Sequence, residues 1–174
     1  EKYRVKIVVE SPTDGSTQTF KDVQQHIQDE QAETHVGNVG DVIDFHDGVT
    51  AHILYPTQNY IPTKDTNDSS VSIVITYGDT SFLLTGDLPI KRETYLLQKN
   101  ILPHHVTVYK AGHHGSKTSS GEQLLSYIKP EYAVISAGLH NKYGHPNQET
   151  LARLETYAKE IISTIDRGTI SFVT

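Results

Sequence analysis

The sequence predicts an α/β fold, because strand-like apolar runs fill its first half and then alternate with helical patterns. Strand patterns dominate up to residue 84, and strands and helices alternate after it. This order describes a sheet with helices on one face, or half of a layered α/β sandwich. The length of 174 residues is that of one domain, and no repeat or linker divides the chain. Residues 1–174 are therefore predicted to form a single domain.

The first half is predicted to contain strands, one helix and two hairpins. A strand runs from Lys2 to Val9, and a Pro and an Asp-Gly pair then form a turn. A helix follows from Phe20 to Glu30, with Thr19 as its N-cap. The other strands of this half are a short one at 34–36, a hairpin of 42–45 and 49–55, and a clear hairpin of 71–77 and 80–85.

The second half is predicted to contain three helices separated by strands. The helices are expected at 91–99, 122–128 and 148–159, and the strands at 106–110 and 132–136. Two final short strands, or a hairpin, are expected at 161–164 and 169–173. The hydroxyl residues ahead of the second helix would by default cap it; they are Ser116, Thr118, Ser119 and Ser120.

The composition excludes several classes of protein. With 36% apolar and 21% charged residues, the chain is too apolar and too weakly charged to be disordered. No apolar run approaches the roughly 18 residues of a membrane span. The absence of Cys excludes disulfides, thiolate metal sites and a Cys nucleophile. A net charge of −6 argues against a general electrostatic grip on a polyanion, although bound metal ions could supply positive charge locally.

Three loops that follow predicted strands gather residues suited to metal chemistry. They contain Asp87, the pair His113 and His114, and His145. Loops at strand ends are where α/β folds place their active sites. Carboxylate and imidazole ligands suit Zn, Mn or Fe, and a carboxylate can bridge two metals. The remaining histidines are interpreted as structural or surface residues, although His140 could line the site; they are His26, His35, His46, His52, His104, His105 and His140.

Each of these residues also has an ordinary structural explanation. A Gly-Asp pair after a strand is usually a turn, so Asp87 could simply cap it. Pro146 could fix a turn before the next helix, with His145 only preceding it. The His113-His114 pair differs from a surface pair, because Gly on both sides allows a close backbone approach and unusual dihedral angles. The N-terminus of the helix at residue 122 could also hold a phosphate.

The motifs closely resemble those of the metallo-β-lactamase-fold domain of the ComEC competence proteins. The matching segments occur in the family's order and at its spacing; they are Phe82 to Leu88, Tyr109 to Ser120 and Asn141 to Pro146. Residues 40–45 and 67–71 also match. The resemblance covers residues 37–174 well and the first thirty residues loosely, and the run from His113 to Ser119 is its most specific part.

The resemblance implies an αββα sandwich and a metal-dependent phosphodiester hydrolase of the nuclease type, with two Zn or Mn ions in a complete domain. It implies that Asp87 is the bridging ligand and that His114, or alternatively His113, is a metal ligand. His145 would be a ligand or would contact phosphate. Catalytic roles would fall to Asp87, His113 and His145, metal binding to Asp87, His114 and His145, and substrate contacts to Ser116, Lys117, Thr118 and Asn141.

The resemblance also implies partners and a location. Single-stranded DNA would be the substrate, and the membrane channel domain of the parent protein would be a partner. The domain would lie at the extracellular face of the cytoplasmic membrane or elsewhere in the cell envelope. Two alternatives stay open: an exported metallohydrolase acting on another phosphoester, and a degenerate, non-catalytic module that has kept the fold.

One departure from the family is large, since no His-x-His occurs in the 174 residues. The superfamily's His-x-His-x-Asp-His motif supplies most of the metal ligands. The chain is therefore expected to be the C-terminal half to two-thirds of such a domain, incomplete at its N-terminus, or a degenerate relative. One carboxylate and three imidazoles cannot fill two metal sites, so the chain alone is expected to be inactive or nearly so. An exposed sheet edge would favour a homodimer.

Overall fold

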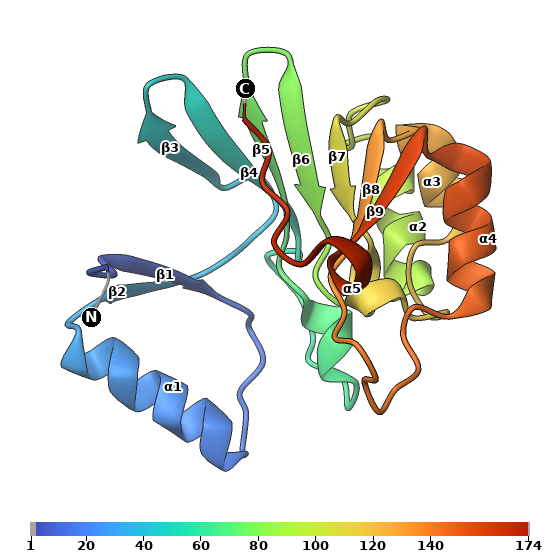
Figure 1. Ribbon diagram of the computed structural model, residues 1–174. Helices are drawn as coiled ribbons and strands as arrows, with labels where there is room; N and C mark the ends of the chain where they lie inside the picture. Colours follow the sequence, from blue (N-terminus) through green and yellow to red (C-terminus); the bar gives the residue numbers. More distant parts are fainter. Residues whose placement is uncertain (1–2, 174) are drawn as a thin grey trace.

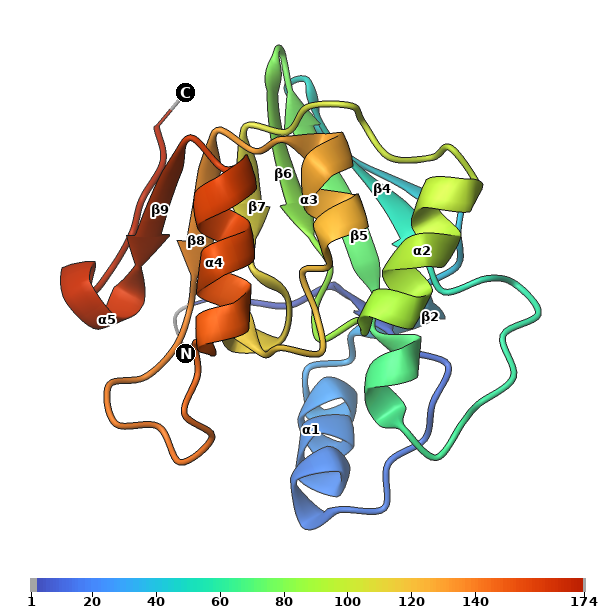
Figure 2. The ribbon, with the colours of Figure 1, turned by 90° about the vertical axis from the view of Figure 1, so that its right-hand side faces the viewer.

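The computed structural model describes residues 3–173, which form a large sheet and a small one (Figure 1). The large sheet has seven strands in the order β3-β4-β5-β6-β7-β8-β9, so each strand lies beside its neighbour in the sequence. Neighbouring strands are antiparallel from β3 to β6 and parallel from β6 to β9. Helices α2, α3 and α4 cover one face of this sheet (Figure 2). The α/β prediction is confirmed, in the form of a sheet with helices on one face.

The antiparallel half consists of two hairpins, as predicted. Its strands are β3 (Val42–His46), β4 (Val49–Tyr55), β5 (Ser72–Tyr77) and β6 (Thr80–Leu84). The β3–β4 turn places Asp47 and Gly48 at φ values of 52° and 85°. Asp and Gly tolerate such left-handed angles, which is why this pair signalled the turn in the sequence.

The parallel half alternates strands with helices, and its predicted elements are confirmed to within two residues at each end. Its strands are β7 (Val108–Lys110), β8 (Tyr132–Ile135) and β9 (Glu160–Ser163), and its helices are α2 (Ile90–Gln98), α3 (Glu122–Ile128) and α4 (Gln148–Tyr157). Parallel strands require such crossover connections, and the helices that form them bury their apolar faces on the sheet.

The hydrophobic core lies between these helices and the sheet. Leu83, Tyr109 and Ala133 stand at the same register on three adjacent strands, and each is fully buried. Each helix contributes a fully buried leucine to the same cluster; they are Leu96 of α2, Leu125 of α3 and Leu154 of α4. The parallel strands are therefore held in place by helix packing.

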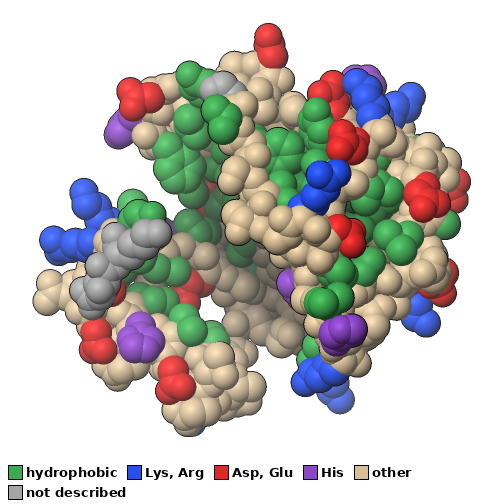
Figure 3. Space-filling view, viewed as in Figure 1, with side chains coloured by type: hydrophobic (Ala, Val, Ile, Leu, Met, Phe, Trp, Pro, Cys, Tyr) green, Lys and Arg blue, Asp and Glu red, His purple; other side chains and the backbone are tan. Residues whose placement is uncertain are grey.

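A small strand-helix-strand unit precedes the large sheet and lies apart from it in Figure 1. It consists of β1 (Ile7–Glu10), α1 (Gln18–Asp29) and β2 (Glu33–Val36), and its two strands are parallel. Figure 3 shows a hollow between this unit and the main body, with hydrophobic side chains on its walls. The Ser11 and Thr13 hydroxyls connect the unit to the main body, each 2.7 Å from Ser69 Oγ.

Two predictions in this unit are wrong. The first strand begins at Ile7, not at Lys2, which lies outside the described residues. The helix begins at Gln18, two residues earlier than expected, and its N-cap is Thr17, not Thr19. The Thr17 hydroxyl accepts a 3.2 Å hydrogen bond from the Phe20 N–H, which satisfies one of the free donors of the first turn.

The predicted final hairpin is also wrong. β9 pairs with β8 in parallel, the short helix α5 (Thr164–Arg167) follows it, and residues 169–173 contain no strand. The Phe172 ring instead packs edge-on against Phe82 and Tyr132, with ring centroids 5.7 and 5.5 Å apart. Alternating apolar residues here cover the second face of the sheet, which explains why they resembled a strand.

Leu83 offers a test of this packing. Leu83→Ala would leave a cavity at the centre of the sheet, so we expect it to lower the free energy of unfolding by about 3 kcal/mol. Leu139→Ala is the matched control, because Leu139 is 66% exposed and should cost little. Urea titrations of both variants give the measurement. A loss at Leu83 no larger than that at Leu139 would contradict the described core.

Candidate functional site

The candidate residues lie on three loops at one end of the large sheet. The loops follow β6, β7 and β8, whose C-terminal ends point the same way because these strands are parallel (Figure 1). Leu84 and Lys110, at the ends of β6 and β7, stand at the same register, so the segments that follow them begin side by side. The fold therefore gathers at one edge residues that are 26 to 58 positions apart in the sequence.

Asp87 and His113 face each other across the first two loops. The His113 N–H donates a 3.0 Å hydrogen bond to the Gly86 carbonyl, which ties the two loops together through the backbone. The Asp87 N–H donates to Ser70 Oγ at 3.2 Å. His113 Nε2 consequently lies 3.8 Å from Asp87 Oδ2. This pair is the first contact between predicted site residues.

The His113-His114 pair adopts a strained backbone. Their φ values are 48° and 58°, inside the short helical turn η2 (Gly112–Gly115). Non-glycine residues in this left-handed region cost about 1–3 kcal/mol each, and they cluster at functional sites. The flanking glycines are required by close approach, since a Cβ at Gly112 would lie 2.9 Å from Ser119, and one at Gly115 would lie 2.7 Å from Pro146.

His114 has an imidazole oriented for ligation. Its Nδ1 lies 2.7 Å from the Ser136 carbonyl oxygen, which can only accept, so Nδ1 carries the proton. The lone pair of Nε2 is then free. A metal-binding histidine is commonly oriented by such a carbonyl contact on its other nitrogen. This observation supports the preference for His114 as the ligand, and that role stays a prediction.

His145 completes the cluster from the third loop. Its ring centroid lies 5.6 Å from that of His113. Burial lowers the pKa of His145, and the neighbouring imidazoles of His113 and His114 lower it further. A lowered pKa favours the neutral form, which is the form that binds metals. The Nδ1 atoms of His113 and His145 are buried without a hydrogen-bond partner, which marks both as candidates for an additional interaction.

The residues predicted to contact substrate lie on the second and third loops. Lys117 and Thr118 are exposed, whereas Ser116 is buried, with its hydroxyl 3.0 Å from that of Thr118. The Asn141 side chain shapes the third loop, because its amide makes hydrogen bonds to the backbone of Gly138, Tyr143 and His145. Contacts from these four residues to a substrate stay predictions.

Two charged side chains that the sequence analysis did not single out hold the second loop. The carboxylate of Glu93, only 1% exposed, accepts hydrogen bonds from the N–H groups of Ser120 and Gly121 at 2.7 and 2.8 Å. From the other side, Arg153 donates to the carbonyls of Ser119 and Ser120 at 3.0 and 2.9 Å. These contacts connect α2 and α4 to the loop.

The Glu93 contacts correct the predicted cap of α3. Gly121 is the N-cap and no hydroxyl caps the helix, because the Glu93 carboxylate takes the N–H groups where the helix begins. Burial raises the pKa of Glu93 to about 7, although the two N–H donors and Arg153 oppose the shift. The sequence carried one signal, a Glu beside Lys91 and Arg92 on a helix, but that pattern is typical of a solvated face.

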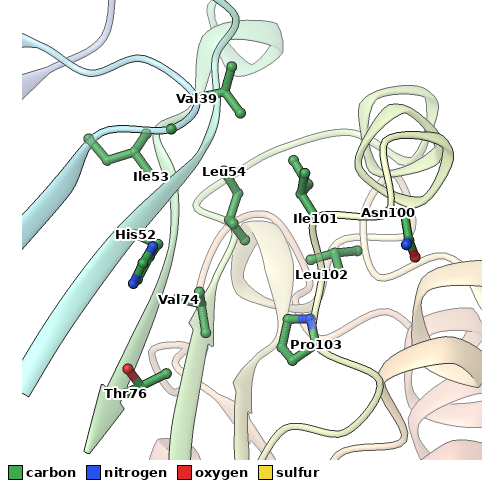
Figure 4. Close-up of a pocket in the computed structure, with 11 residues that line it drawn as sticks. Val39, His52, Ile53, Leu54, Val74, Thr76, Asn100, Ile101, Leu102 and Pro103 are labelled. Atoms are coloured by element: carbon green, nitrogen blue, oxygen red, sulfur yellow. The ribbon is translucent and has the colours of Figure 1, made fainter.

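Two hollows near the sheet differ in their chemistry. A hollow of about 320 Å³ adjoins the site and is lined by His114, His145 and the residues between β8 and α4. A larger hollow of about 510 Å³ lies between β4, β5 and the segment after α2 (Figure 4). Apolar side chains line most of it, and His52 is its one titratable lining residue. The smaller hollow is the one that coincides with the candidate residues.

The donor set suits a divalent metal ion but does not close around one. Asp87 offers oxygen and the three histidines offer nitrogen, the ligand types of Zn and Mn sites. Within residues 3–173, no group of three or more His, Cys, Asp or Glu side chains converges tightly enough to hold an ion. These residues therefore fit part of a metal site, with further coordination positions left to water or other donors.

Comparison with known proteins identifies the family. Residues 19–139 match the family model described as the metallo-beta-lactamase superfamily. The chain belongs to this superfamily. Its members typically depend on divalent metals, which agrees with the kinds of ligand gathered here. The match includes Asp87, His113 and His114, whereas His145 lies beyond it.

Relatives of this superfamily member include competence proteins. It is 37% identical over 134 residues to ComE operon protein 3 of Bacillus subtilis (strain 168), which is 76% of this chain and 17% of that protein. It is 34% identical over 126 residues to competence protein ComA of Neisseria gonorrhoeae, covering 72% and 18% of the two chains. The chain thus spans less than a fifth of these relatives, and the predicted resemblance to the ComEC family is confirmed.

A solved structure supports the fold alone. CmlA, a diiron beta-hydroxylase from Streptomyces venezuelae, aligns with a TM-score of 0.54 and 9% identity, over 90% of this chain and 38% of that one. Together with the family match, this likeness confirms the predicted metallo-β-lactamase-like α/β fold.

Glu93 should make stability depend on pH. Its pKa rises from 4.5 to about 7 on folding, so the stability it contributes is fully present below pH 4.5 and is lost as the pH rises through 7. A shift of this size corresponds to about 3 kcal/mol. We expect Glu93→Gln to remove most of that loss, measured as the free energy of unfolding at pH 5 and pH 8.

Glu155→Gln is the matched control for this prediction, because Glu155 is exposed on α4. It should leave the pH dependence unchanged. The assignment is wrong if the unaltered chain and Glu93→Gln lose equal stability between the two pH values.

Proposed function

We propose that this chain forms part of a metal-dependent phosphodiester hydrolase site of the nuclease type, which acts in DNA uptake during competence. One observation carries the proposal: Asp87 and three imidazoles gather on adjacent loops of a metallo-β-lactamase fold. The competence relatives support the biological setting. The substrate proposed is a single strand of DNA.

The residues take distinct roles in this proposal. Asp87, His114 and His145 hold a Zn or Mn ion, and a complete domain holds two. When bound there, such an ion would supply Lewis-acid activation of the attacking water. The Ser136 carbonyl accepts a hydrogen bond from His114 Nδ1, which fixes the orientation of the ring and leaves Nε2 to bind the metal ion. His113, next to Asp87, holds a proton and gives it to the leaving oxygen.

Substrate contacts come from the exposed end of the second loop and from the third loop. The Lys117 ammonium attracts phosphate locally, which an acidic chain needs because its net charge of −6 repels a polyanion. Thr118 offers an exposed hydroxyl next to Lys117 in the chain, and the buried Ser116 hydroxyl lies 3.0 Å behind it. Asn141 contributes by holding the shape of the loop that carries His145.

The competence setting suggests partners and a location. The proposed partner is the membrane channel domain of a larger competence protein, and the proposed location is the extracellular face of the cytoplasmic membrane or the cell envelope. Within residues 3–173, no helix is both long enough and apolar enough to cross a bilayer. A homodimer is proposed because β3 and β9 are the edge strands of the large sheet.

Two alternative functions keep the same fold. An exported metallohydrolase of another phosphoester would use the same metal-binding residues on a smaller substrate. A degenerate, non-catalytic module would keep the fold without metal binding, although the intact Thr85-Gly86-Asp87 and His113-His114-Gly115-Ser116 runs weigh against it. Measuring metal binding distinguishes the non-catalytic module from the proposal. Comparing DNA with a small phosphoester as substrate distinguishes the exported hydrolase.

Metal binding tests the proposed site directly. We expect the chain to bind one Zn or Mn ion weakly, and Asp87→Asn to reduce the affinity by about tenfold or more, because a charged oxygen donor is lost. Asp79→Asn is the matched control, since Asp79 is exposed in the β5–β6 turn. Titration calorimetry and elemental analysis provide the readout. Equal affinities for the two variants would refute the role of Asp87.

Hydrolysis tests whether this chain is active alone. One carboxylate and three imidazoles cannot fill two metal sites, so we expect little or no cleavage of labelled single-stranded DNA with either metal. Bis(p-nitrophenyl) phosphate serves as the small-substrate arm. Robust cleavage that Asp87→Asn abolishes would overturn the expected inactivity and would still support the reaction class. Hydrolysis of the small ester alone would favour the exported-hydrolase alternative.

A further inference from the structure

An exposed aromatic ring stands beside the candidate site. The loop between β8 and α4 projects from the end of the sheet (Figure 1) and carries Tyr143, which is 67% exposed. An aromatic side chain this exposed leaves a large apolar surface in water, which is more typical of a contact surface than of a folding element. The loop is nevertheless ordered by hydrogen bonds from Asn141 to the backbone of Tyr143 and His145.

The Tyr143 ring borders the hollow of about 320 Å³ that adjoins the candidate metal residues. The segment directly after β8 lines this hollow with three small residues, Ser136, Ala137 and Gly138. Small residues leave backbone and open space, whereas Tyr143 provides a broad flat surface. This hollow is called the slot below. With one aromatic boundary and small lining residues, it suits a planar ring. Its volume is at the lower end of the range for small-ligand pockets.

A row of rings connects this slot to the metal residues. Tyr143 stacks on His145, with ring centroids 5.8 Å apart and planes 21° apart. The His145 ring lies 5.6 Å from that of His113, whose Nε2 faces Asp87. A planar group stacked on Tyr143 would therefore lie next to the imidazoles.

A cation accompanies the ring. Lys142 Nζ lies over the face of the Tyr143 ring, 5.0 Å from its centroid, so a base that stacks on that face takes its place. Lys and Arg next to aromatic rings are typical of sites that bind single-stranded nucleic acid, where bases stack and cations track the phosphates. The chain has a net charge of −6 and repels phosphate overall, so the positive charge of Lys142 provides attraction at this point.

We propose that Tyr143 is a stacking residue for one nucleobase of a single-stranded nucleic acid, held in the slot between β8 and α4 beside Lys142. The inference rests on the proposed function, because it assigns a base-contacting residue to that same site. It gives the site a means to distinguish a nucleic acid strand from a small phosphoester, which carries no base to stack.

A fluorescent oligonucleotide tests this proposal. The probe is a five-nucleotide DNA strand with 2-aminopurine at its centre, titrated with the chain at low salt and with EDTA present. Stacking on Tyr143 should quench the fluorescence. Tyr143→Ala should weaken binding about 5- to 100-fold, the range for loss of one base–aromatic stack. Tyr143→Phe should retain binding because it keeps the ring.

Tyr77→Ala is the matched control, because Tyr77 is 46% exposed and lies at the end of β5 away from the site. It should bind as the unaltered chain does. Circular dichroism of each variant shows whether it is folded. If Tyr143→Ala does not fold, Tyr143→Ser is measured in its place with the same expected loss.

An abasic strand separates stacking from charge. It keeps every phosphate and lacks all five bases, so Tyr143→Ala should change its affinity by less than about twofold. Equal weakening of the intact and abasic strands would overturn the proposal, as would the absence of quenching by the unaltered chain. Equal affinity for dAMP and for the five-nucleotide strand would overturn its single-strand part.

The test is independent of catalysis. Because EDTA removes divalent metals, the binding result does not depend on whether the site holds an ion or hydrolyses DNA. A chain that binds metal but shows no Tyr143-dependent stacking would leave the proposed hydrolase intact and remove the base slot. A chain that stacks the base but binds no metal would keep the base slot and remove the proposed hydrolase.

Discussion

The parallel register of β6, β7 and β8 is the constraint on which the site depends. Parallel strands end at the same edge of the sheet, so the segments that follow them emerge together. The buried register row of Leu83, Tyr109 and Ala133, packed under three helices, keeps that alignment. A shift of one residue between two of these strands would turn their side chains to the opposite face. It would also separate the loops that carry Asp87 and His113.

Polar contacts hold these loops in backbone conformations that are unfavourable on their own. The left-handed backbone of His113 and His114 is unfavourable in isolation. It persists because hydrogen bonds to Gly86 and Ser136 hold both residues in place. Glu93 accepts hydrogen bonds from the following N–H groups and Arg153 donates to the carbonyls, so the side chains of these two residues hold the end of that loop. The site is therefore preorganised by helices α2 and α4, which carry none of the candidate ligands.

Most of the fold could be predicted because its signals are local. Turn residues such as Asp47-Gly48 and the apolar periodicity of the helices act over a few neighbouring positions, and both hairpins and the three later helices were found from them. The missed final segment reflects long-range packing, whereas the missed cap is a local choice between two nearby threonines. Phe172 alternates like a strand residue but packs on Phe82, and Thr19 precedes the predicted helix although Thr17 caps it.

By itself, the sequence determined the family and the identity of the candidate residues, because motifs such as Thr85-Gly86-Asp87 and the glycine-flanked His pair are contiguous in the chain. Only the tertiary structure decided how these residues meet. It set the 3.8 Å approach of Asp87 to His113 and the tautomer of His114, and it buried Glu93 behind the loop. Such contacts depend on strand register and burial, which no local pattern of residues encodes.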